Sequence, residues 1–105
     1  MRVLEFIADK QLLQKNPACD FSNIAPGSSG YLTAHFEFSA REWRDCVKAA
    51  SFWHNGKEYA VLLKNDACLI PTEALVGRKF EVSVSGAKTN GYRITSTRTT
   101  VKQEG

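Results

Sequence analysis

The sequence predicts an all-β domain, a sandwich or barrel of about eight short antiparallel strands. Apolar and polar residues alternate with a period of two over residues 31–38 and again over 80–85. That alternation is typical of strands with one buried face. Turn residues recur roughly every ten residues, and no long stretch has the periodicity of a helix.

The length of 105 residues favours one domain over 1–105. Hydrophobic residues make up 43% of the chain and charged residues 24%, so we expect a folded globular protein. Residues 16–30 are rich in Pro, Gly, Asn and Ser, which predicts the most mobile internal loop of the chain. Residues 103–105 are predicted to be a frayed end.

The first elements follow from short alternating runs. Residues 2–7 are predicted to form a strand, and residues 12–15 a short partner for it. Ser39 precedes Glu42 by three residues, which is the spacing of a capping box and predicts one helical turn that ends near Asp45. The clearest strand is predicted over residues 31–38, just before this helical turn. The side chains that it directs into the core are Leu32, Ala34, Phe36 and Phe38.

Residues 47–54 and 58–64 predict a β-hairpin. Asn55 and Gly56 join the two arms, and this pair suits a type I′ turn because both central positions need a positive φ. Phe52 is placed on the inner face of the first arm. The second arm is apolar on both faces, so we expect the hairpin to be central or covered by an interface.

The second half of the chain continues the pattern of short elements. A strand over 67–70 is stopped by Pro71, and residues 72–75 read as a further single helical turn. A strong strand follows over 80–85. Two segments close the sequence, residues 92–95 and 99–102.

Charge and cysteine content exclude several classes of protein. The net charge is +3 and the basic residues are scattered, so no basic track predicts a nucleic-acid partner. Cys19, Cys46 and Cys68 are odd in number and form no C-x-x-C pair, which predicts free thiols in a reducing cytoplasm and no zinc site. No run approaches the ~20 apolar residues of a membrane helix.

No pattern of catalytic residues is visible. His35 and His54 fall in no hydrolase or metalloprotease motif, and nothing in the spacing pairs His35 with Cys46. The carboxylates are spread singly, and there is no phosphate-binding glycine loop. We therefore predict a protein that is not an enzyme and needs no metal or cofactor.

The two tryptophans are predicted to differ in role. Trp43 is expected to plug an open end of the sandwich from the helical turn. Trp53 lies on the face opposite to Phe52, next to the hairpin tip, where an exposed aromatic side chain indicates an interface. The candidate partner contacts are Trp53, His54 and Tyr31. The alternatives for Trp53 are a packing role in the domain and a sugar-stacking platform shared with Tyr31 or Tyr92.

An ordered set of motifs covers residues 30–96. The motifs are Phe36–Ser39, Glu42–Trp43, Lys48–Phe52, Tyr59–Leu63, Ile70–Leu75, Phe80–Gly86 and Arg93–Ser96. This order resembles small structural domains of tailed phages and prophages of Gram-positive bacteria. In that family Asp-Gly usually follows the E-W or D-W pair, whereas here Arg44, Asp45 and Cys46 follow it.

The resemblance implies an immunoglobulin-like sandwich with one or two single-turn helices, as part of a virion assembled in the host cytoplasm. The expected role is a structural protein or anchoring module in a tail, baseplate, fibre or capsid-decoration assembly. Its partners would be other virion proteins, with homo-oligomers in the particle. The residues implied to determine the fold are Phe36, Phe38, Trp43, Phe52, Pro71, Leu75 and Phe80.

Two alternatives of other classes stand beside this prediction. One is a carbohydrate-binding module that recognises a glycan on a host cell surface. The other is a small host-directed inhibitor or enzyme, which requires a cleft that joins His35 or His54 to Cys46 or to a carboxylate.

Overall fold

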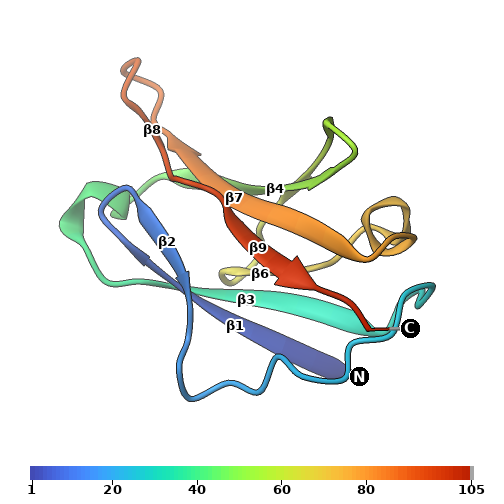
Figure 1. The fold of residues 1–105 in the computed structure, drawn as a ribbon. Helices are drawn as coiled ribbons and strands as arrows, with labels where there is room; N and C mark the ends of the chain where they lie inside the picture. Colours follow the sequence, from blue (N-terminus) through green and yellow to red (C-terminus); the bar gives the residue numbers. More distant parts are fainter. Residues whose placement is uncertain (105) are drawn as a thin grey trace.

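Residues 1–104 are described by a computed structural model, and they form two β-sheets packed face to face (Figure 1). The predicted all-β sandwich is confirmed. Sheet A has the strand order β2-β1-β3-β6. Its strands are β1 (Arg2–Asp9), β2 (Leu12–Lys15), β3 (Leu32–Phe38) and β6 (Ala67–Leu69).

Sheet B has the order β5-β4-β7, and two short strands share the edge of β7 that faces away from β4. β8 pairs with residues 85–87 of β7 and β9 pairs with residues 79–82. Its strands are β4 (Val47–His54), β5 (Lys57–Leu62), β7 (Lys79–Ala87), β8 (Arg93–Thr95) and β9 (Thr99–Lys102). The predicted helical turns are present as the 3-10 helices η1 (Arg41–Trp43) and η2 (Thr72–Leu75). No capping box forms at η1, because its N-cap is Ala40 and no side chain caps it.

The core lies between the two sheets. Alternate residues of each long strand point into it, as the period of two predicts. Phe6 and Phe36 stack there with ring centroids 5.2 Å apart. Of the residues implied to determine the fold, Phe38 and Pro71 are half-buried. The others are fully buried, namely Phe36, Trp43, Phe52, Leu75 and Phe80.

Sheet A departs from a wholly antiparallel arrangement at one pair of strands. β1 and β3 run parallel, with Arg2 opposite Leu32 and Ala8 opposite Phe38. A parallel pair needs a connection that returns the chain to the end where the first strand began. Residues 16–31 provide that return along the bottom of the molecule in Figure 1.

The return segment is anchored at several points. The Arg2 guanidinium donates to the carbonyl oxygens of Asp20, Ser22 and Asn23 at 3.0, 2.6 and 3.1 Å. Ile24 is buried in the core, and the ring of Phe21 packs edge-on against Phe6. The mobility of this loop stays a prediction.

Residues 103 and 104 contact the rest of the domain at two points. Gln103 is buried, and its amide nitrogen Nε2 donates to the Gly77 carbonyl at 2.9 Å. The Glu104 N–H donates to the Ile24 carbonyl at 2.7 Å. The predicted fraying of 103–105 stays a prediction, and residue 105 lies outside the described residues.

The β4–β5 hairpin forms as predicted, with a two-residue turn. Asn55 and Gly56 have φ values of 50° and 76°, as a type I′ turn requires. Within the hairpin β4 is central in sheet B, whereas β5 is an edge strand. An edge strand that is apolar on both faces is the least expected feature of the fold.

Candidate functional site

The free edge of β5 exposes backbone groups and apolar side chains together. We use the name β5 edge for residues 58–63. Leu62 is 71% exposed, and Glu58 and Ala60 are exposed beside it. Natural edge strands are usually short, bulged or charged, because an open edge pairs with other chains. β5 begins with two charged residues, Lys57 and Glu58, but it has no such protection at Ala60, Val61 and Leu62.

Hydrogen-bond geometry shows which backbone groups of β5 are free. His54 and Lys57 flank the two-residue turn, so odd-numbered residues of β5 exchange bonds with β4. The Leu63 N–H confirms this, since it donates to the Lys48 carbonyl at 2.9 Å. Even-numbered residues must then direct their N–H and C=O groups away from β4. At Lys64 those groups already bond Ala67, at 3.0 and 3.2 Å.

Three residues consequently present unpaired backbone groups along one line: Glu58, Ala60 and Leu62. Among residues 1–104 no backbone group is bonded to their outward N–H or C=O. An open row of this kind is the surface used when an extended strand adds to a sheet.

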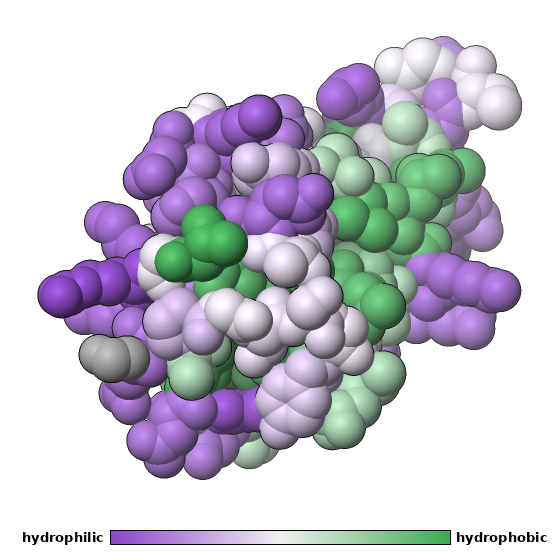
Figure 2. Space-filling model, turned by 90° about the vertical axis from the view of Figure 1, so that its right-hand side faces the viewer, coloured by the Kyte–Doolittle hydropathy of each residue, from purple (hydrophilic) through white to green (hydrophobic). Residues whose placement is uncertain are grey.

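Both faces beside the β5 edge are apolar. Tyr59, Val61 and Leu63 lie on the inner side, only half-buried against the core. On the outer side Leu62 lies opposite Ala49 of β4, and Val47 is 70% exposed. Figure 2 shows hydrophobic side chains gathered along the right-hand side of the face that it draws.

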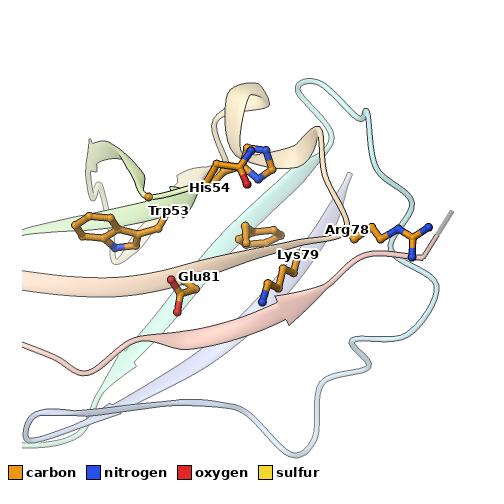
Figure 3. Close-up of a pocket in the computed structure, with 8 residues that line it drawn as sticks. Trp53, His54, Arg78, Lys79 and Glu81 are labelled. Carbon is orange, nitrogen blue, oxygen red and sulfur yellow. The ribbon is translucent and has the colours of Figure 1, made fainter.

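Trp53 and His54 line a hollow of about 390 Å³ between the hairpin tip and the start of β7. Figure 3 shows that the labelled side chains around it diverge. Arg78 points outward, and Lys79 and Glu81 point away from the His54 ring. His54 packs on Gly77, where an added Cβ would lie 2.4 Å from its Cε1. The hollow therefore gathers no set of convergent polar groups.

The aromatic platform, one of the alternatives for Trp53, does not form. The Arg98 guanidinium lies 3.6 Å from the centre of the Trp53 ring, and the indole N–H donates to Ser83 Oγ at 3.1 Å. Tyr31 and Tyr92 line two other hollows, and the Tyr92 hydroxyl donates to the Glu42 carbonyl at 2.8 Å. The expectation that Trp53 shares one exposed face with a tyrosine is thus wrong, because a cation already covers the indole.

The structure separates His35 from Cys46 but places it beside a carboxylate, which is one of the pairs that the enzyme alternative requires. His35 Nδ1 lies 2.6 Å from Glu5 Oε1, on the outer face of sheet A. Cys46 instead packs beside Trp43 and Gly86. Only the parallel register of β1 with β3 places Glu5 opposite His35, so the sequence pattern could not reveal this pair.

The three thiols are free and half-buried. Burial raises the pKa of Cys68 to about 11, from a usual value near 9.0. Its thiolate fraction at mildly alkaline pH should be about a hundredfold lower than that of an ordinary thiol. We expect alkylation of Cys68 by iodoacetamide, followed by mass spectrometry, to keep accelerating up to about pH 11. A plateau near pH 9 would contradict this.

Within residues 1–104 no three metal-ligating side chains lie close enough to bind an ion together. Neither helical turn has the length or the apolar character needed to span a bilayer. The chain matches no protein-family model, no curated protein and no solved structure. The fold and its surfaces are therefore the basis for any functional assignment.

Proposed function

We propose that this chain is a structural module of a phage particle that acts through protein–protein contacts at the β5 edge. The observation that carries the proposal is the open row of backbone groups at Glu58, Ala60 and Leu62, bordered by apolar side chains. The phage setting rests on the ordered motifs over residues 30–96.

The geometry favours binding over chemistry. The β5 edge offers main-chain hydrogen bonds and exposed apolar area, which together support strand addition. Several motif residues serve the core, since Phe36, Trp43 and Phe80 are buried. The motif Tyr59–Leu63, in contrast, lies along the β5 edge. A rigid sandwich that binds through the β5 edge suits a symmetric assembly, because the weak contacts of many copies together give a high avidity.

The test is incorporation into particles. A tagged chain expressed during growth of the phage that encodes it should purify with the particles and label them at repeated positions in electron micrographs. Leu62→Glu buries a charge in the proposed contact, so the amount of chain per particle should fall at least about tenfold.

Leu12→Glu is the matched control. Leu12 is 50% exposed on β2, one of the two edge strands of sheet A, and its substitution should leave incorporation unchanged. Particles that carry no label, with all tagged chain left in the unassembled fraction, would contradict the proposed function.

A further inference from the structure

We infer that the β5 edge binds a second copy of this chain, by antiparallel pairing of β5 with β5 about a two-fold axis at Ala60. The inference rests on the proposed function in taking the same edge as the contact surface. It names the partner and the register, which the proposed function leaves open.

The register follows from the free backbone groups. Glu58, Ala60 and Leu62 are the outward-facing residues, and Lys64 is already bonded to Ala67. Pairing centred on Ala60 puts Glu58 opposite the second copy's Leu62 and Ala60 opposite its own copy. All three residues then exchange N–H and C=O bonds. A register centred on Val61 would instead direct Glu58 to the occupied groups of Lys64.

The side chains suit this register on both faces. On the inner side Tyr59 meets the second copy's Val61, an aromatic–β-branched pair of the kind that stabilises antiparallel strands. On the outer side the small Ala60 side chains face each other across the axis. Both copies contribute the same patch, as a closed two-fold interface requires.

The charges of the strand are also self-complementary. No two like charges lie directly opposite in this register, because Glu58 faces Leu62 and Lys57 faces Leu63. Lys64 is the diagonal neighbour of the second copy's Glu58, within reach of a long side chain. Glu58 Oε2 already accepts a hydrogen bond from Ser51 Oγ at 2.5 Å, so Lys64 would pair with the other carboxylate oxygen at each end of the interface.

Sedimentation of the purified chain over a concentration series should show a reversible monomer–dimer equilibrium. Leu62→Glu places two carboxylates opposite each other at both ends, whereas Leu62→Lys places an ammonium group opposite Glu58. The dissociation constant of the Glu variant should therefore exceed that of the Lys variant at least about tenfold. Leu12→Glu should leave the constant unchanged.

Cysteine cross-linking tests the register directly. In a hydrogen-bonded pair of antiparallel strands, the Cα atoms of directly opposite residues lie about 5.5 Å apart. This distance falls within the Cα–Cα range that a disulfide spans. Ala60→Cys should give a covalent dimer under mild oxidation, with the bond mapped by mass spectrometry. Leu62→Cys should not, because its copy lies four residues along the strand, about 13 Å away. Circular dichroism checks that each variant is folded.

A chain that stays monomeric at every concentration overturns the inference, and so does a cross-link through Leu62→Cys in place of Ala60→Cys. A monomeric chain that still enters particles, with incorporation lost in Leu62→Glu, leaves the proposed function standing and makes the partner a different protein. A chain that dimerises but is absent from particles would contradict the proposed function and leave this inference standing.

Discussion

Trp43→Ala should lower the free energy of unfolding by about 3–5 kcal/mol, which is a large part of the about 5–15 kcal/mol available to a domain. Trp43 is 1% exposed, and its ring lies 5.0 Å from that of Phe38. Its indole N–H donates to the Lys10 carbonyl at 2.7 Å. The side chain thus links η1, the β1–β2 turn and β3, and its removal leaves both a cavity and an unpaired carbonyl.

Urea unfolding followed by far-ultraviolet circular dichroism measures this loss without relying on tryptophan fluorescence. Trp53→Ala is the matched control, because Trp53 is half-buried on the outer face of sheet B. We expect it to cost less than half as much as Trp43→Ala. Equal losses of unfolding free energy for the two variants would contradict the role of Trp43 in holding η1, the β1–β2 turn and β3 together.

Gly86→Val should be the second strongly destabilising substitution. A Cβ at Gly86 would lie 3.0 Å from Cys46 Cβ and 3.2 Å from Trp43 Cε3. Overpacking of this kind costs about 1–3 kcal/mol, and valine adds two further methyl groups. Even Gly86→Ala should destabilise, because this cost exceeds the about 0.4–1 kcal/mol that a glycine-to-alanine change gains from the unfolded chain.

The origin of the effect can be tested with a double-mutant cycle. Cys46→Gly removes the nearest side-chain atoms, so the double variant Gly86→Ala/Cys46→Gly should lose less stability than the sum of the two single variants. A Gly86→Ala variant that is more stable than the parent protein would refute the packing argument.

Local elements could be predicted from the sequence because their signals are local. The period of two over residues 31–38 identified β3 and its buried face, and Asn55–Gly56 identified the hairpin turn. The same reasoning placed Trp43 in the core and Trp53 on the alternate face from Phe52. Each of these follows from a few neighbouring residues.

Relations between distant segments could not be predicted in this way. Residues 2–7 indicate a strand, but nothing in them indicates a parallel partner about thirty residues later. The apolar pattern of β5 reads equally well as a central strand or a covered edge, and only the sheet order distinguishes the two. The stacking of Arg98 on Trp53 could not be predicted either, because it joins two segments that are far apart in the sequence.

The parallel pairing of β1 with β3 also shapes how the chain can fold while it is being synthesised. The first two strands are complete at residue 15, but β1 gains its second neighbour only when β3 is complete at residue 38. At ribosomal speeds the intervening 23 residues take about 1–5 s. During that interval β1 has one unpaired edge, and the apolar face of the hairpin stays uncovered for longer still, until the strands of sheet B have been synthesised.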